Sequence, residues 1–343
     1  MKVKKIAIVS LSKGILGEDF VSHEVKLGEE RIKNLGINLC YMPNALKGLE
    51  YLENHPEKRA EDLINAFSDP TIDMILCSIG GDDTYRLLPY LFENDELKKV
   101  INPKIFLGFS DSTINHFMLN KLGVKTFYGQ SFLSDVCELS STMLPYTEYY
   151  FKELLTTGKI EKIEPSPVWY DSRSDFSSNA IGTITSSHQN EGFVLLQGSP
   201  TFSGKILGGC IDTIYDIFDN TRYKNSPILC ERYKLFPSIE EWKGKILLLE
   251  SSEEKASPEK YRTMIKTLKD YGIFKVISAL LIGQPMDRTY ESEYIQILKD
   301  VIDDESLPIV TNINVGHSLP RCIIPFGVMS HIDVDKQVIE FEY

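Results

Sequence analysis

The sequence predicts an α/β protein of two domains, with an open, mostly parallel, doubly wound sheet first and a unit of mixed strands and helices after it. Three observations predict this class. Short apolar runs typical of buried parallel strands alternate with helical segments through the first 135 residues. A length of 343 residues suits about two domains. Hydrophobic residues make up 42% and charged residues 25% of the chain, which is ordinary for a globular protein.

The N-terminal part is expected to alternate strand and helix in a regular order. Apolar runs of four to eight residues predict strands, and apolar residues at helical spacing predict the helices between them. The expected strands cover residues 6–9, 37–42, 72–79, 105–109 and 126–128. The expected helices cover residues 19–35, 61–67, 84–92 and 112–122. Gly36 and Gly123 follow two of these helices as stop signals.

The rest of the chain is expected to form a crossover and a second folding unit. A helix is expected over 146–155, and residues 164–197 are rich in Ser, Pro, Asn and Asp, which favours a long loop. Further strands are expected at 245–249, 276–282 and 308–315, with two more in 326–341, and helices at 258–271 and 294–302. The predicted division is an N-terminal domain over 1–150, a crossover and substrate loop over 151–197, and a C-terminal domain over 198–343.

Charge and composition exclude several classes of protein. Asp and Glu outnumber Lys and Arg by 49 to 37, and the basic residues are scattered rather than gathered in a stripe. Nucleic acid and a strongly anionic lipid surface are therefore not expected as partners. The apolar run near the N-terminus is too short for a signal peptide, and no stretch reaches the length of a membrane span. The six cysteines show no CxxC spacing and suit buried free thiols. These features predict a cytoplasmic protein.

The segment KIFLGFSDSTINHFMLNKL carries the first candidate for catalysis. An apolar strand ends at GFSDS and a helix begins at once, so Ser110 is expected at a tight turn between them. The pattern GxSxS is similar to the nucleophile elbow GxSxG, in which the serine hydroxyl is lifted out of the sheet beside the N–H groups of a helix N-terminus. The alternative is that Ser110 or Asp111 only caps the helix.

A serine nucleophile needs a base, and the base needs an acid that orients it. Among the six histidines, His317 differs because it follows the apolar run PIVTNINV and a glycine, at the end of a predicted strand. Glu250 ends the run KILLLE, so its carboxylate is expected at the exit of a buried strand. The alternatives are a loop histidine bonded to backbone and a solvated glutamate, since Glu253 and Glu254 follow closely.

The segment GGDDT, residues 80–84, also follows a strand and opens a helix. Two glycines let the backbone approach a ligand closely, with N–H groups pointing at it. The segment can be a tight turn that needs positive φ, or part of an oxyanion hole or substrate site, and the two interpretations are compatible.

Taken together, these segments resemble the serine peptidase family S66, which holds the LD-carboxypeptidases and the microcin C self-immunity proteins. The resemblance is collinear over nearly the whole chain and rests on IGGDDTYRLLPYL, FLGFSDST, TFYGQSFLSD, GKILGGCIDTI, KILLLESSEE and GHSLPRCIIPFG. It implies that Ser110 is the nucleophile, Glu250 the triad acid and His317 the base, with the backbone N–H groups of Gly81 and Asp111 holding the oxyanion. It also implies a Rossmann-like N-terminal domain, a triad assembled across the two domains, a homodimer, and no metal or organic cofactor.

Within the family, Asp82 and Asp83 after the paired glycines resemble the microcin-immunity branch more than the muropeptide branch. This implies an amide hydrolase that cleaves peptidyl or aminoacyl nucleotides, with hydrolysis of the L,D bond of a murein tetrapeptide as the alternative. Trp169 is either a residue that stacks on a nucleobase or an anchor for its loop. Arg86 either holds a phosphate or pairs on the helix surface. Gly80, Asp82 and Asp83 complete the expected substrate-binding residues.

Two interpretations from other classes remain at this point. The GGDDT turn is similar to the glycine-rich turn with which NAD kinases hold phosphate, but Asp83 adds negative charge at that place, and a kinase leaves the serine, glutamate and histidine unexplained. A protein that only sequesters a nucleotide is the other interpretation. Neither HExxH nor a similar metal motif is present.

Overall fold

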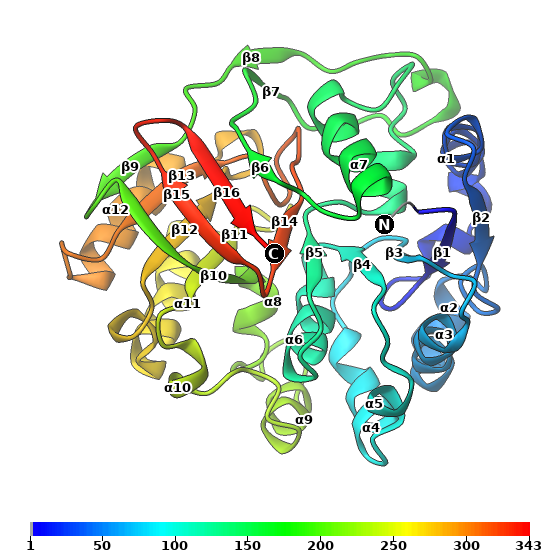
Figure 1. Ribbon diagram of the computed structural model, residues 1–343, viewed down its shortest axis with the longest axis horizontal. Helices are drawn as coiled ribbons and strands as arrows, with labels where there is room; N and C mark the ends of the chain where they lie inside the picture. The colour runs from blue at the N-terminus through cyan, green and yellow to red at the C-terminus, as the bar shows by residue number, and fades with distance from the viewer. Residues whose placement is uncertain (1–2) are drawn as a thin grey trace.

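The computed structural model describes residues 3–343 and contains two large sheets that lie side by side (Figure 1). The first sheet has six strands in the order β14-β5-β4-β3-β1-β2. Its strands are β1 (Lys5–Val9), β2 (Asn38–Tyr41), β3 (Met74–Cys77), β4 (Ile105–Gly108), β5 (Thr126–Tyr128) and β14 (Ile324–Phe326). β1 to β5 are parallel, and β14 joins the edge antiparallel to β5. The doubly wound α/β class predicted from the sequence is confirmed.

Helices cover both faces of the first sheet in Figure 1, with α1 and α7 on one side and α3 to α6 on the other. They are α1 (Ser22–Asn34), α2 (Leu49–Asn54), α3 (Pro56–Ser68), α4 (Leu88–Phe92), α5 (Glu96–Val100), α6 (Thr113–Lys121) and α7 (Pro145–Thr157). Helix α3 is longer than the predicted 61–67 because Pro56 occupies its first turn, where a missing N–H costs nothing. The short helices α2 and α5 were not predicted.

The second sheet has eight strands in the order β6-β16-β15-β10-β11-β12-β13-β9. These strands are β6 (Lys162–Ile163), β9 (Val194–Gln197), β10 (Thr201–Cys210), β11 (Ile246–Glu250), β12 (Ala279–Gly283), β13 (Ile309–Ile313), β15 (Met329–Asp333) and β16 (Val338–Glu342). β10 to β13 are parallel and fully buried where they adjoin, which places the C-terminal core under them. The helices of this part are α8 (Ile211–Tyr215), α9 (Ser226–Arg232), α10 (Ile239–Trp242), α11 (Pro258–Tyr271) and α12 (Glu291–Ile302).

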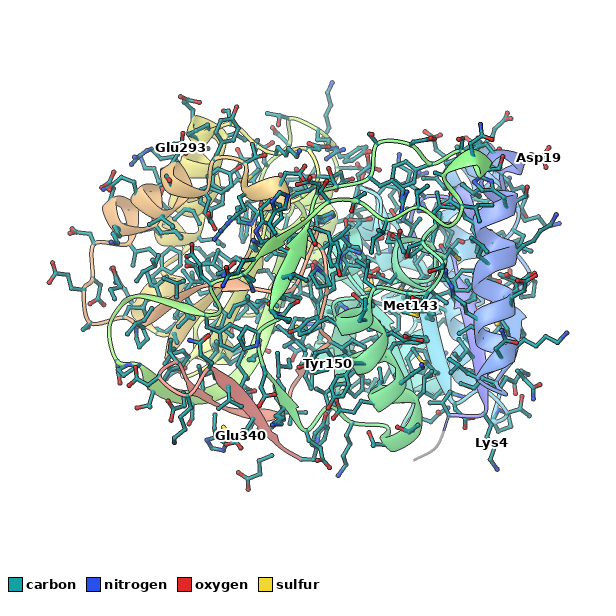
Figure 2. All side chains as sticks on the ribbon, turned by 90° about the horizontal axis from the view of Figure 1, so that it is seen from above. Lys4, Asp19, Met143, Tyr150, Glu293 and Glu340 are labelled. Carbon is teal, nitrogen blue, oxygen red and sulfur yellow. The ribbon has the colours of Figure 1, made fainter. Side chains whose placement is uncertain are left out.

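The segment 151–197 is more ordered than the long loop predicted for it. β6 and β9 lie at opposite edges of the second sheet, and β7 (Val168–Tyr170) pairs with β8 (Ser187–Gln189) in a small two-stranded sheet. Conversely, β14 comes from the C-terminal part and completes the first sheet. The crossover segment therefore supplies both edge strands of the second sheet, and the C-terminal part supplies one strand of the first sheet. In the view of Figure 2, α7 with Tyr150 lies between α1 at one end and α12, which carries Glu293, at the other.

All six cysteines are free, and five of them are buried. Within residues 3–343, none of the helices combines the length and the apolar character needed to cross a membrane.

Candidate active site

Ser110 lies at the turn between β4 and α6, as the sequence predicted. Residues Ser110–Ser112 form a single helical turn, and Ser110 has φ +63°, a conformation that few residues other than glycine adopt. Holding it there costs on the order of 1–3 kcal/mol, which the surrounding contacts must offset. Thr113 Oγ1 donates to the Ser110 carbonyl at 2.7 Å and helps to fix the turn. This is the geometry of a nucleophile elbow.

The structure brings Ser110, His317 and Glu250 together in one hydrogen-bonded chain. Ser110 Oγ lies 3.1 Å from His317 Nε2, and His317 Nδ1 lies 2.7 Å from Glu250 Oε2. All three side chains are buried. Ser110 follows β4 of the first sheet, whereas Glu250 ends β11 and His317 follows β13 of the second sheet. The site therefore lies where the carboxyl ends of strands from both sheets meet.

Glu250 fixes the orientation of the His317 ring. Its Oε2 atom accepts hydrogen bonds from the ring Nδ1–H and from the backbone N–H of His317, the latter at 3.3 Å. A proton held at Nδ1 leaves Nε2, on the side of Ser110, free to accept one. Gly316 is required beside it, because a Cβ there would overlap the Glu250 carboxylate.

Tyr128 connects Glu250 to Ser110 and was missed from the sequence. Its hydroxyl donates to Glu250 Oε1 at 2.6 Å and accepts the backbone N–H of Ser110 at 3.1 Å. The residue ends β5, in the first sheet, so it reaches across to the second. The sequence placed Tyr128 at the end of a strand but gave no sign of which way its ring would face.

The paired glycines lie directly against Ser110. A Cβ on Gly80 would be 2.6 Å from Ser110 Cβ, so only glycine allows this approach. The carboxylate of Asp111 accepts hydrogen bonds from Ser12 Oγ at 2.6 Å and from Thr84 N at 2.9 Å, which ties the GGDDT turn to the nucleophile turn. Within residues 3–343, the backbone N–H groups of Gly81 and Asp111 make no hydrogen bond. They are thus available to an oxyanion.

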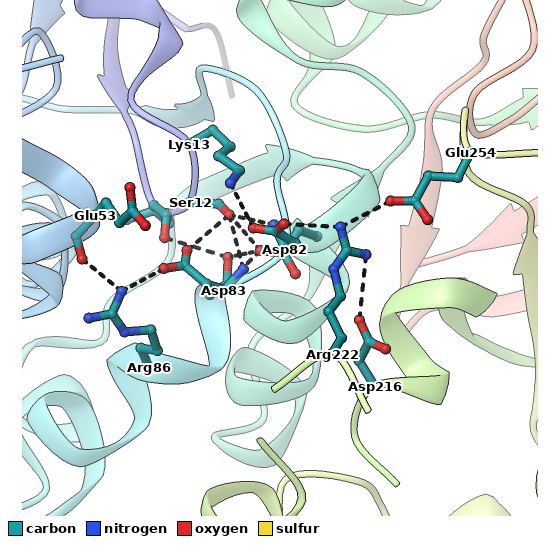
Figure 3. A network of polar contacts seen from close by, with 12 residues as sticks. Ser12, Lys13, Glu53, Asp82, Asp83, Arg86, Asp216, Arg222 and Glu254 are labelled. Carbon is teal, nitrogen blue, oxygen red and sulfur yellow. Dashed lines mark hydrogen bonds and ion pairs between the residues drawn. The ribbon is translucent and has the colours of Figure 1, made fainter. Parts of the chain in front are cut away.

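The side chain of Asp83 is engaged inside the protein. Arg59, which is fully buried, donates to both carboxylate oxygens at 2.6 and 3.0 Å. Arg86 donates to the same carboxylate at 2.9 Å (Figure 3). Burial opposes ionisation, but the two arginines hold the pKa of Asp83 below its usual value. Arg86 also donates to the Glu53 carbonyl at 2.7 Å. These contacts agree with the second alternative for Arg86, in which it pairs with neighbouring protein groups.

Asp82 faces the other side of the turn and joins the two parts of the chain. It pairs with Lys13 at 3.1 Å and with Arg222 at 3.0 Å, and Arg222 also reaches Glu254 at 3.0 Å and Asp216 at 3.8 Å (Figure 3). A pocket with about 420 Å³ of empty space adjoins the turn. Its lining includes Ser12, Lys13, Asp82, Asp83, Arg86 and Tyr223.

Trp169 lies in β7, and its indole ring stacks on the imidazole of His188 with ring centroids 4.2 Å apart. The next residue, Tyr170, donates its N–H to the Leu319 carbonyl at 2.9 Å. Since Leu319 is two residues from His317, the hairpin of β7 and β8 is attached to the loop that carries the histidine. Within residues 3–343, no hydrogen bond or ring stacking joins Trp169 to Ser110, His317 or Glu250.

Glu253, which the sequence indicated only as a solvated acid, contacts His317 directly. Its Oε2 atom lies 2.9 Å from His317 Nε2, although 63% of its side chain is exposed. This hydrogen bond lowers the pKa of Glu253 to about 2. Burial works against the charged form of His317, but the negative charge of Glu250 and hydrogen bonds to Glu250 and Glu253 raise its pKa to about 10.

Arg321 holds the loop of His317 from behind. Its guanidinium pairs with buried Asp135 at 2.8 Å, donates to the carbonyls of Gly316 and His317, and lies over the ring of Phe109. The loop is therefore fixed by buried polar contacts at both ends.

Within residues 3–343, one group of three side chains has the spacing of metal ligands. The ligand atoms of Cys210, Glu250 and His317 lie within 4.8 Å of one another. The Glu250 and His317 atoms already face each other across a hydrogen bond, so a metal would have to replace that contact. The arrangement suits proton transfer along the Ser110–His317–Glu250 chain, and the sequence predicted no cofactor.

Two family models match the chain. The model of the LD-carboxypeptidase N-terminal domain covers residues 6–129, and that of the LD-carboxypeptidase C-terminal domain covers residues 203–332. Between them lies the segment with the Trp169 hairpin.

Solved structures and curated proteins agree with the models. The crystal structure of an MccF-like protein from Streptococcus pneumoniae in complex with AMP is 63% identical, covers 99% of both chains and superimposes with a TM-score of 0.99. The microcin C7 self-immunity protein MccF of Escherichia coli is 26% identical over 82% of this chain and 77% of its own length. A structure of MccF in complex with aspartyl sulfamoyl adenosine covers 100% of this chain and 97% of its own, with a TM-score of 0.80 at 22% identity, which shows the shared fold.

Proposed function

The chain belongs to the LD-carboxypeptidase family, peptidase S66, and is a serine peptidase-type hydrolase, in which we propose that Ser110, His317 and Glu250 are the catalytic triad. The observation that carries the proposal is the hydrogen-bonded chain from Ser110 Oγ through the His317 ring to Glu250, with distances of 3.1 and 2.7 Å. Membership in this family leaves the kinase interpretation of the GGDDT turn without support.

The proposed reaction is acyl transfer. Ser110 Oγ attacks the carbonyl carbon of an amide while His317 Nε2 takes its proton, and Glu250 stabilises the imidazolium that forms. The N–H groups of Gly81 and Asp111 hold the oxyanion. His317 then gives the proton to the leaving amine, and water hydrolyses the acyl-enzyme by the same steps.

The proposed substrate is a peptidyl or aminoacyl nucleotide conjugate of the microcin C type, whose cleavage would give self-immunity or detoxification. Two similarities support this class: the MccF-like protein that is 63% identical was crystallised with AMP, and MccF itself with aspartyl sulfamoyl adenosine. The pocket beside Asp82 and Arg86 suits the acyl part of such a substrate, and Trp169 is proposed to stack on the nucleobase. In the present structure His188 covers one face of the indole.

The test is a side-by-side hydrolysis assay with an aminoacyl sulfamoyl-adenosine amide and an L,D-linked muramoyl tetrapeptide. The wild-type protein should cleave the nucleotide conjugate, and Ser110→Ala should lower turnover by about a thousandfold or more. Ser112→Ala is the matched control, because its hydroxyl lies two residues along the same turn and bonds to Cys77 rather than His317. Cleavage of the tetrapeptide alone would favour the muropeptide alternative, and full activity of Ser110→Ala would refute the triad.

A cytoplasmic location stays a prediction from the sequence, and a homodimeric state stays a prediction from the resemblance. The division at residues 150 and 198 is likewise kept as a proposal. It is complicated by β14, which comes from the C-terminal part and joins the first sheet, and by β6 and β9, which join the second sheet from the crossover.

A further inference from the structure

Glu253 occupies the atom of His317 on which the proposed reaction depends. It follows Glu250 by three residues, on the loop after β11, and its Oε2 atom lies 2.9 Å from His317 Nε2. The same nitrogen lies 3.1 Å from Ser110 Oγ. Glu253 and Ser110 therefore compete for one ring atom.

The two contacts demand opposite states of the ring. With Nδ1–H donated to Glu250, Nε2 can donate a proton to the Glu253 carboxylate only when the ring is an imidazolium, and it can accept the Ser110 proton only when the ring is neutral. With Glu253 in place, the ring is a cation between two carboxylates and cannot act as a base. In addition, Nε2 must later hand its proton to the leaving amine, so Glu253 stands where that amine has to approach. A productive complex requires Glu253 to move away.

Glu253 is free to move away from the His317 ring. Its side chain is 63% exposed, and its carboxylate is held by His317 and by a hydrogen bond from its own backbone N–H, so rotation about its own bonds is enough to release it from the ring. The nearest cation on the same side, Arg222, is already held by Asp82, Asp216 and Glu254.

The other charged groups around His317 are either acidic or already paired. Glu250 and Asp212 are acidic, and Asp212 already accepts the N–H of Ser252 at 2.9 Å. Arg321 lies behind the loop and is paired with buried Asp135. Solvent can receive the exposed Glu253 carboxylate, and an ammonium group on a bound substrate would compete with His317 for it at close range.

We propose that Glu253 is a specificity residue that binds a substrate ammonium group next to the scissile bond, so that conjugates with a free α-amine are preferred over N-blocked ones. This rests on the proposed function. In an aminoacyl conjugate the α-nitrogen lies about 2.5 Å from the carbonyl carbon that Ser110 attacks. The ammonium group is thus within reach of a carboxylate that starts 2.9 Å from His317 Nε2. Binding it withdraws Glu253 from the ring and frees Nε2.

The experiment compares an aminoacyl sulfamoyl-adenosine amide with its N-acetyl derivative, in which an uncharged and bulkier amide replaces the ammonium group. The kcat/KM ratio of the pair is measured for the wild type, Glu253→Gln and Glu254→Gln. The wild type should favour the free amine by about tenfold or more, as expected for a close charge pair in a partly buried site. The ratio should fall toward one in Glu253→Gln. Glu254→Gln removes the same charge one residue away, where it pairs with Arg222, and should keep the wild-type ratio.

A ratio that Glu253→Gln leaves unchanged would overturn this inference alone, and so would a wild type that does not distinguish the two compounds. Cleavage of neither compound by the wild type would refute the proposed function. In that case the dissociation constants of the pair, measured by calorimetry on Ser110→Ala with and without Glu253→Gln, still decide the role of Glu253. Tighter binding of the free amine that depends on Glu253 supports it, and equal or absent binding refutes it.

Discussion

Replacing Tyr128 by Phe removes a single oxygen atom from the centre of the site. The ring itself is held by stacking on Phe326, with centroids 5.4 Å apart, and by contact with His116 at 5.2 Å. Phe should therefore keep the packing and open almost no cavity. What is lost is the hydroxyl that bonds Glu250 Oε1 and accepts the Ser110 N–H.

The magnitude follows from these two hydrogen bonds. A bond to an ionised carboxylate contributes about 1.5–3 kcal/mol, and a buried N–H without an acceptor costs about 1–3 kcal/mol. Because the two share one atom, they do not add fully, and we expect the free energy of unfolding to fall by about 2–4 kcal/mol. The Ser110 turn, with its φ of +63°, also loses one of its restraints, so kcat/KM should fall by about ten- to a hundredfold.

The change should also leave a mark on the pH profile. The Tyr128 hydroxyl withdraws charge from Glu250, so without it Glu250 stabilises the His317 imidazolium more strongly. The pKa of His317 should then rise above its already raised value, and the ascending limb of kcat/KM should move to higher pH. Denaturant unfolding measures the free energy of unfolding, and kcat/KM for the nucleotide conjugate, measured across pH, locates the ascending limb.

Tyr271→Phe is the matched control for this experiment. Tyr271 also loses one hydrogen bond, to the Pro237 carbonyl at 3.0 Å, but lies away from the triad. It should lower stability slightly and leave the pH profile in place. A Tyr128→Phe protein with the wild-type profile and wild-type kcat/KM would refute the reasoning.

Two further outcomes are expected on the same substrates. Glu253→Gln removes a negative charge that stabilises the His317 imidazolium, so the pKa of His317 should fall from about 10 and the ascending limb of kcat/KM should move to lower pH, opposite to Tyr128→Phe; a limb that stays or rises would contradict this. Trp169→Ala should raise KM for the nucleotide conjugate by about ten- to a hundredfold, the value of one stacked base, and leave hydrolysis of a conjugate without a nucleobase unaffected; equal losses on both would argue for a structural role.

Site residues that directly follow a buried strand were the easiest to predict from the sequence. Ser110, Glu250 and His317 were each placed by an apolar run followed by a polar residue, and parallel strands bring their carboxyl ends to one edge. The elements missed were those without such a run. β10 reads TFSGKILGGC, in which three glycines interrupt the apolar pattern, and it forms because β11 and β15 pair with it on either side.

Contacts between side chains of the two sheets could not be predicted from the sequence, for a different reason. Tyr128 and Glu253 act through contacts with residues 122 and 64 positions away, and nothing local to either segment sets those distances. Glu253 was especially hard to identify, because two adjacent glutamates, Glu253 and Glu254, are typical of a solvated surface. The raised pKa of His317 is the physical signal that distinguishes it, and that signal exists only after folding.

The position of the base relative to the nucleophile is set by the backbone as well as by the triad itself. Ser110 belongs to the first sheet and His317 to the second, so their 3.1 Å contact depends on how the sheets are joined. Seven residues after His317, the chain enters β14 and pairs with β5, with Ile324 opposite Tyr128. One continuous segment thus carries the base and adds a strand to the sheet of the nucleophile. Tyr128 in that strand pair also bonds Glu250. The positions of Ser110, His317 and Glu250 are therefore all fixed relative to the β5–β14 edge of the first sheet, although two of these residues come from strands of the second sheet.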